Sequence, residues 1–298
     1  MKLNIHQVII SYFYQFLIYL WNNYFDMETT KRHNYLLNWI EKQQSLGRYT
    51  FSLEQLKQDF PNVTDQAINL ALSRLSNKGR ILSVYKGFYL IVSPEYSSRG
   101  VLPPVLFIHQ LMQYIGKPYY VGLLSAAALH GAAHQQPQEF FVVTSSKQAP
   151  TKRKGLKINY IKKKNIPENL IEKRKTESGY VHVSEPELTA ADLIYYHNRV
   201  GGLNRAATVL NELAEAMKPK NINQELMQNV PMATLQRLGF ILEDILQQHD
   251  LSEKLYNQLQ KRKTKLFMQP LKTGVATNHF PRNKKWKIII NTNIEIDE

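Results

Sequence analysis

The sequence predicts an α+β fold in two parts, and three observations lead to that prediction. The chain has 298 residues, which is enough for two domains of ordinary size. Helical periodicity dominates the beginning and ends in two short runs with strand composition. Beyond a turn-rich stretch at 93–104, strand-like and helical segments are mixed, and helices dominate the C-terminal half. We therefore expect a small domain at 27–95 and a larger mixed α/β domain at 96–298.

Residues 1–26 are set apart from both domains. The run from Val8 to Trp21 is almost wholly apolar and aromatic, but it is 14 residues long and is interrupted by Ser11 and Gln15. A membrane-spanning helix needs about 20 residues, and the flanks lack the features of a signal peptide. We interpret Met27 as the true first residue and 1–26 as an overcalled start. A weak membrane anchor is the alternative.

Two helices are expected after Met27. The first places Leu36, Leu37 and Ile40 on one face and stops at Gly47. The second begins with the S-x-x-Q pattern of Ser52 and Gln55, which is a capping box.

A third helix is expected between Thr64, which can cap its N-terminus, and Gly79, which can end it. Its apolar residues recur at i, i+3, i+4 and i+7, so one stripe is buried. The opposite side carries amides, a hydroxyl and a guanidinium, the groups that pair with base edges in a DNA major groove. These candidate base-reading residues are Gln66, Asn69, Ser73, Arg74 and Asn77.

Two strands follow at 81–85 and 88–92, with Lys86-Gly87 placed where a tight hairpin turns. Three helices and then a hairpin is the order of a winged helix-turn-helix, whose third helix enters the major groove. We expect Lys78, Arg80 and Lys86 to meet backbone phosphates. A winged helix used only for docking a protein is an alternative.

The formal net charge of +14 indicates a polyanionic partner. Eleven Lys or Arg against two Glu fall between Lys147 and Lys175, which places +9 of that charge in one stretch. Two triplets there form a candidate second basic surface at the two ends of one expected strand: Lys152, Arg153, Lys154 and Lys162, Lys163, Lys164. The structural alternative is a pair of solvated loops, because lysines without interleaved aromatic residues give affinity but no sequence reading.

The larger domain is expected to alternate helices and short strands. Helices are predicted at 105–116, 120–135, 186–217 with a break at Gly201-Gly202, 232–250 and 252–263. Strands are predicted at 139–145, 156–162 and 180–184, with a last one at 283–296.

No motif assembles a catalytic centre, so we expect no catalytic residue, no cofactor and no metal. The chain has no cysteine, which excludes a thiolate zinc site and a cysteine nucleophile. His130 and His134 have i, i+4 spacing but lack an evident third ligand. A nuclease carried by a winged helix stays an alternative, and it would require carboxylates that converge within 139–192.

Four segments in order resemble the AbiEi family of antitoxins from bacterial abortive-infection toxin–antitoxin pairs. They are GRILSVYKGFYLI, YVGLLSAAALHGAAHQQPQEFFVVTS, SEPELTAADLIYYHNRVGGLNRAATVLNEL, and the closing RLGFILEDIL with NKKWKIIIN. The resemblance spans roughly 27–297, and the stretch before Met27 departs from the pattern.

The resemblance implies a non-enzymatic, cytoplasmic protein that does two things. Its N-terminal domain would bind double-stranded operator DNA and repress its own operon. The sequence leaves dimerisation open, although repressors commonly read paired half-sites as homodimers. Its C-terminal domain would counter a nucleotidyltransferase-like toxin, functionally and without a requirement for stable contact. No membrane partner is expected, and the resemblance transfers no individual antitoxin residue.

Overall fold

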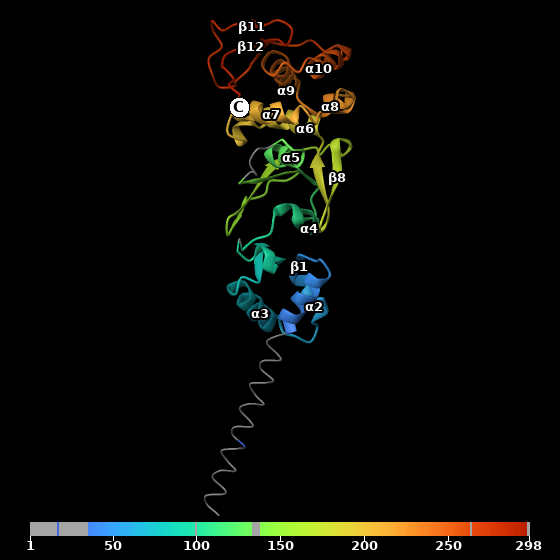
Figure 1. Ribbon diagram of the computed structural model, residues 1–298, viewed down its shortest axis with the longest axis vertical. Helices are drawn as coiled ribbons and strands as arrows, with labels where there is room; N and C mark the ends of the chain where they lie inside the picture. The colour runs from blue at the N-terminus through green and yellow to red at the C-terminus, as the bar shows by residue number, and fades with distance from the viewer. Residues whose placement is uncertain (1–16, 18–34, 99, 133–137, 263, 297–298) are drawn as a thin grey trace, which may run out of the picture. The chain divides into compact units, whose positions relative to one another are not determined.

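The computed structural model describes residue 17 and residues 35–98, 100–132, 138–262 and 264–296 (Figure 1). The expectations for 1–26 therefore lie outside the described residues. The chain divides into two compact units between Leu102 and Pro103. Both units combine helices with sheets, so the α+β class is confirmed.

The first unit contains a helix at 35–45, followed by one strand, two helices and two strands. Its further elements are β1 (Thr50–Ser52), α2 (Leu53–Asp59), α3 (Asp65–Asn77), β2 (Ile81–Tyr85) and β3 (Phe88–Ile91). The strands form an antiparallel sheet in the order β1-β3-β2. The short strand β1 is absent from the expected elements, since three residues carry too little periodicity to be recognised.

The expected helix boundaries in this unit are confirmed by their caps. The Ser52 hydroxyl accepts a hydrogen bond from the backbone N–H of Gln55 at 3.1 Å. The Thr64 hydroxyl does the same for Ala67 at the start of α3. Gly79 has φ +68°, which favours glycine because a Cβ would crowd the following carbonyl.

The second unit is built on a six-stranded mixed sheet in the order β6-β7-β5-β4-β9-β8. Its strands are β4 (Tyr119–Val121), β5 (Phe140–Thr144), β6 (Thr151–Arg153), β7 (Leu156–Lys162), β8 (Ile171–Thr176) and β9 (Gly179–Ser184). Helix α4 (Ile108–Ile115) covers one face, while α5 (Leu123–Leu129) and α6 (Pro186–Tyr195) lie on the other (Figure 1).

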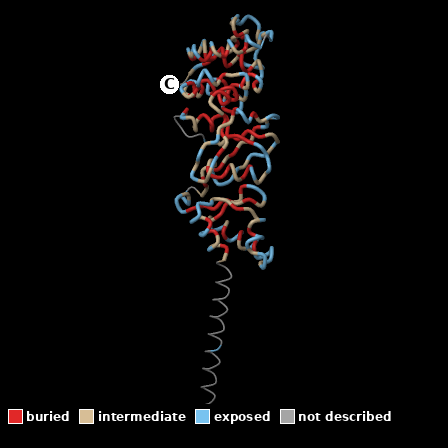
Figure 2. The backbone as a smooth tube through the Cα atoms, turned by 90° about the vertical axis from the view of Figure 1, so that its right-hand side faces the viewer, coloured by how far each residue is buried: buried red, intermediate tan, exposed pale blue. Residues whose placement is uncertain are grey.

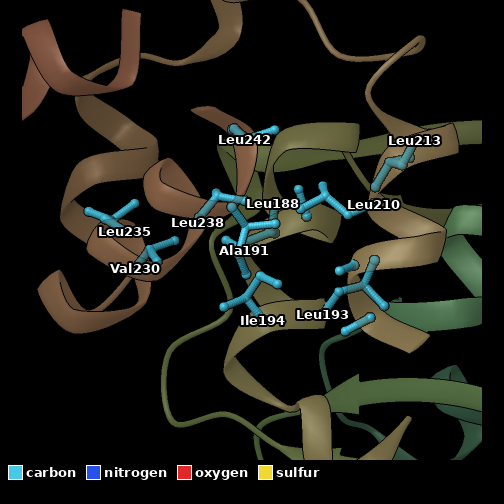
Figure 3. Close-up of a cluster of buried hydrophobic side chains, with 14 of the residues drawn as sticks. Leu188, Ala191, Leu193, Ile194, Leu210, Leu213, Val230, Leu235, Leu238 and Leu242 are labelled. Carbon is cyan, nitrogen blue, oxygen red and sulfur yellow. The ribbon is translucent and has the colours of Figure 1, made fainter. Parts of the chain in front are cut away.

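Helix α6 lies between that sheet and a layer of further helices. The layer comprises α7 (Leu203–Leu213), α8 (Gln224–Asn229), α9 (Met232–Phe240), a π-helical turn (Ile241–Ile245) and α10 (His249–Lys261). Leucines of α6, α7 and α9 meet in one apolar cluster (Figure 3). Every residue from Glu187 to Ile194 is buried, and Figure 2 draws buried residues in red. A helix that is buried on all sides shows no single apolar stripe.

A small sheet closes the chain beside α9. It has the order β10-β12-β11, from β10 (Gln269–Pro270), β12 (Ile288–Ile289) and β11 (Arg282–Asn283). Trp286 is fully buried and its ring lies over Gly239 of α9.

Two expectations for this unit are wrong. The helix expected at 120–135 is preceded by strand β4 and begins only at Leu123, because 119–121 pair with β5 and β9. The final strand expected at 283–296 is reduced to Ile288–Ile289. The burial of Trp286 and the left-handed backbone of Lys287, φ +54°, interrupt the extended chain there.

Within the described ranges no helix combines the length and apolar character required to cross a membrane.

The contact of Gly239 with Trp286 predicts a large effect of a single methyl group. A Cβ at position 239 would lie 2.0 Å from the indole ring, so Gly239→Ala has no room. Although alanine is the better helix former by about 1 kcal/mol, we expect a net destabilisation of about 3 kcal/mol from overpacking. Urea unfolding of the full chain measures it. Gly239→Ala combined with Trp286→Leu should lose less than the sum of the two single variants, and simple additivity would contradict the explanation.

Candidate nucleic-acid interface

The exposed side of α3 presents a continuous polar stripe. At 3.6 residues per turn, Gln66, Asn69, Ser73 and Asn77 fall on one side of the helix, and all four are exposed. Ile68, Leu72 and Leu75 form the opposite, buried side. The structure therefore brings together four of the residues that the sequence predicted as base-reading.

Leu70 also lies on the exposed side of α3, with 53% of its surface accessible. Leu70 is absent from the predicted base-reading residues because only polar side chains on that side of the helix were included. An apolar side chain in this position suits contact with a thymine methyl group. Leu70 lies four residues after Gln66, and this helical spacing already places the two side chains on the same side of α3.

Arg74 and Lys78 occupy the flank of α3 rather than the centre of the stripe. Both are exposed, and both line a groove of about 490 Å³ between α3 and the helix at 35–45. Tyr35, Leu37 and Leu70 contribute apolar walls to it. Arg74 is thus positioned at the edge of the polar stripe, on the side of α3 that faces the groove.

The hairpin of β2 and β3 carries Lys86 exposed at its turn, where Gly87 has φ +73°. Arg80 lies elsewhere, at the base of the hairpin, where its backbone N–H bonds the Leu75 carbonyl. Its guanidinium is 3.4 Å from Glu41. Arg80 therefore has a partner on the helix at 35–45, and Lys86 is exposed at the turn.

The two lysine triplets of the second unit do not form one patch. Lys152, Arg153 and Lys154 lie at the exposed tip of the β6–β7 hairpin, while Lys162 and Lys164 are exposed at the far end of β7. The seven residues of β7 separate the ends by about 23 Å at strand spacing. The structure confirms their placement at opposite ends of one strand.

Lys163 departs from its neighbours. Its side chain is 15% exposed, and its ammonium lies 3.0 Å from the carboxylate of Asp192 and 3.2 Å from the Tyr120 hydroxyl. Tyr120 donates to the other oxygen of Asp192 at 2.5 Å. Burial, with the neighbouring Asp192 charge, raises the pKa of Tyr120 well above its ordinary value, so the phenol keeps its proton. The charge of Lys163 is compensated inside the fold and adds little to a basic surface.

Much of the remaining charge between 147 and 175 belongs to the edges of the sheet. β6 and β8 are the two outer strands, and they carry Lys152, Arg153, Lys173, Arg174 and Lys175. Charged side chains on edge strands prevent pairing with a second sheet. This arrangement gives the excess of positive charge a structural role that needs no ligand.

Three of the acidic side chains between 139 and 192 are directed to different partners. Glu139 is bonded to Lys157 and Asn159, Glu187 accepts from the backbone N–H of Lys218, and Asp192 pairs with Lys163. Among the described residues no group of three or more His, Cys, Asp or Glu could hold a metal ion. Burial and the charges of Glu187 and Glu172 raise the pKa of Glu185, so these three acidic groups lie near one another without forming such a metal-binding group.

His130 ends α5, and its Nε2 lies 2.7 Å from the Ser184 carbonyl. Ser184 is the last residue of β9, so this contact joins the end of α5 to the end of that strand, while His134 lies outside the described residues.

Comparison with known proteins identifies one segment of the second unit. Residues 120–244 match the model of the AbiEi antitoxin C-terminal domain. This AbiEi segment covers β4 to the π-helical turn and supports an antitoxin role in a toxin–antitoxin system. It is less than half of the chain, and it contains the Tyr120–Lys163–Asp192 network. No curated protein matches the sequence.

Two solved structures are similar to this chain to different degrees. The RV2827C protein from Mycobacterium tuberculosis is 14% identical, with a TM-score of 0.60 over 84% of this chain and 89% of that chain. The likeness concerns the fold alone. An antigenic nucleotidyltransferase-like protein from Paracoccidioides brasiliensis is 11% identical, with a TM-score of 0.33 over 51% of this chain and 89% of that chain.

The network inside the AbiEi segment predicts a difference between breaking and replacing an ion pair. Asp192→Ala leaves the Lys163 ammonium buried and unpaired, so we expect a loss of about 3–5 kcal/mol. The double variant Asp192→Leu with Lys163→Met should recover a large part of it, because neither charge remains. Chemical denaturation of the full chain measures both. Equal losses in the two variants would show that the pair is not the source of the effect.

A second cavity, of about 700 Å³, lies beside α4 and β9 in the same unit. It is lined by His109, His182 and Tyr119, and the two imidazole centroids are 5.1 Å apart. The Tyr119 hydroxyl is 3.1 Å from Nδ1 of His109. Burial lowers the pKa of both histidines, and Lys173 lowers it further.

These lowered pKa values predict acid sensitivity. An unfolded chain binds protons at histidine near pH 6.5, while the folded chain resists them, so stability is complete above that pH and falls as the pH decreases through the folded values. His109→Gln with His182→Gln should flatten the decline in melting temperature between pH 7 and 5. An unchanged decline would assign it to other groups, His130 among them.

Proposed function

We propose that this protein is a DNA-binding transcriptional autorepressor and antitoxin that counters a nucleotidyltransferase-like toxin in a bacterial phage-defence system. The AbiEi match of residues 120–244 supports the antitoxin part. The exposed polar stripe of α3, flanked by a basic hairpin, is the single observation that carries the DNA-binding part. We assign 27–95 to a winged helix-turn-helix and 96–298 to the antitoxin domain.

The element order of the first unit supports the winged helix assignment. The helix at 35–45, α2 and α3 precede the β2–β3 hairpin, and β1 adds a third strand to it. In such a domain the third helix enters the major groove and the hairpin lies along the phosphates. Gln66, Asn69, Ser73 and Asn77 would then face base edges, with Arg74 beside them.

The contacts fall into two classes with different consequences. Arg74 and the amides of α3 would read sequence, because guanine and adenine edges accept bidentate hydrogen bonds. Lys86, with Lys78, would neutralise phosphates, which contributes affinity without preference. A promoter complex would therefore weaken steeply as the salt concentration rises.

Docking of a protein on the first unit is a second candidate, and the groove of about 490 Å³ beside α3 favours it. Leu70 is both on the DNA-facing side and in this groove. Binding of a protein partner would require the apolar walls of the groove and tolerate loss of the amides on α3. Binding of DNA would require those amides and tolerate changes in the groove walls.

Paired variants separate base reading from phosphate contact. Arg74→Ala should cost about 1–3 kcal/mol on the preferred promoter site and reduce discrimination against other sequences. Lys86→Ala should weaken all duplexes alike and reduce the salt slope by about one. Fluorescence anisotropy with the full chain and its own promoter fragment measures both. Lys220→Ala, an exposed lysine of the second unit, is the matched control.

Wild-type binding by both variants would remove α3 and the hairpin as the reading surface.

The antitoxin part has its own test, which is growth rescue when the full chain is co-expressed with the product of the adjoining gene. Rescue that persists in Arg74→Ala would separate toxin neutralisation from repression.

A further inference from the structure

The C-terminal segment 261–287 carries a concentration of positive charge outside the AbiEi segment. It contains nine Lys or Arg and no Asp or Glu. Two of these cations have internal partners: Lys285 lies 2.5 Å from Glu243, and Arg262 donates to the Met227 carbonyl at 2.7 Å. The remaining described members are exposed or partly exposed: Lys261, Lys265, Lys272, Arg282, Lys284 and Lys287.

The same segment exposes aromatic rings. Phe267 is 64% accessible and Phe280 is 39% accessible. The ammonium of Lys265 is 5.9 Å from the centroid of the Phe267 ring. The exposed Phe267 ring beside a cation provides both a face for base stacking and a charge for phosphate, and Phe280 adds a second exposed ring in the same acid-free segment.

Strand register places these groups along one small sheet. Pro270, Ile289 and Arg282 are neighbours across β10, β12 and β11, and Gln269, Ile288 and Asn283 form the next row. Ile288 is fully buried, so its row faces the core and the row containing Arg282 faces outward. Figure 1 shows β11 and β12 at the margin of the second unit, beside α9.

The two rings lie toward opposite ends of this sheet. Phe267 precedes β10 and is level with Trp286 before β12, whereas Phe280 precedes the antiparallel β11 and is level with Asn291. The exposed cations Lys272 and Arg282 follow β10 and begin β11, so they lie toward the Phe280 end.

The underside of the sheet is fixed by hydrogen bonds to α9 and the π-helical turn. Gln236 donates to the carbonyls of Phe267 at 2.9 Å and Trp286 at 2.8 Å, and Arg237 donates to the Pro270 carbonyl at 2.9 Å. Glu243 accepts from the Trp286 indole. Backbone groups held in this way preorganise the outer surface, which lowers the entropic cost of binding.

We propose that the segment 265–287 binds single-stranded nucleic acid. Its exposed lysines and Arg282 would follow the phosphates, and Phe267 and Phe280 would stack on unpaired bases. A duplex is disfavoured because its base faces are already stacked on one another. An acidic protein would use the cations but gain nothing specific from ring faces. The proposal is independent of operator binding by α3.

Anisotropy of labelled twelve-nucleotide oligo(U) and oligo(dT) with the full chain tests the proposal, and the two oligomers distinguish RNA from DNA. Phe267→Leu should weaken binding about tenfold, while Phe267→Trp keeps the ring and the affinity. Lys272→Ala and Arg282→Ala should each lower the salt slope by about 0.7. Lys220→Ala is the matched control, and operator binding should be unchanged in every variant.

Inorganic polyphosphate provides a probe that has charge and no bases. It should bind, and Phe267→Leu should leave its affinity unchanged. Three results would overturn the proposal: no binding of either oligomer at 50 mM salt, equal affinity of the Leu and Trp variants, or loss of binding only when Lys152 and Arg153 of the β6 tip are replaced by Ala.

Discussion

The second unit depends on one constraint, which is that α6 is buried from Glu187 to Ile194 while it carries two carboxylates in that stretch. An uncompensated charge in that position would cost several kcal/mol. Glu187 is satisfied near the helix start, by the backbone N–H of Lys218 and the amide of Asn221. Asp192 is satisfied from the sheet, by Tyr120 of β4 and Lys163 after β7. The helix therefore fixes the positions of the sheet and of the helical layer at once, and the AbiEi segment is the part of the chain that surrounds it.

The features that could be predicted from the sequence are those determined by interactions between residues close together in the chain. Ser52 and Thr64 were recognisable as caps because their hydrogen bonds reach only three residues along the chain. Strand β4 was mistaken for helix because three residues show no period, and their pairing with Thr144 and Val183 is set by distant strands. The sequence analysis did not predict β8. As an edge strand it carries consecutive charged residues in place of alternating apolar and polar ones, so the run of Lys173, Arg174 and Lys175 resembles a solvated turn.

The same distinction separates the site residues. The stripe on α3 was predictable, since helical spacing alone places Gln66, Asn69, Ser73 and Asn77 together. The sequence does not distinguish Lys163 from its neighbours Lys162 and Lys164. In the structure only Lys163 is turned inward, where it pairs with Asp192, and that partner lies 29 residues further along the chain. Arg80 was expected to serve phosphate, and its partner Glu41 lies 39 residues away. Pairings at such separations depend on the fold and leave no local pattern.

Positive charge in this chain therefore has several causes, and its total is a poor guide to function. The cations of β6 and β8 protect sheet edges, Lys163 neutralises a buried acid, and Lys285 is held by Glu243. What distinguishes a binding surface is the group beside the charge. On α3 the neighbours are amides, which suit base edges, and in the C-terminal segment they are exposed rings, which suit base faces. These two chemistries suit paired and unpaired strands respectively, so the two proposed surfaces would not compete for one ligand.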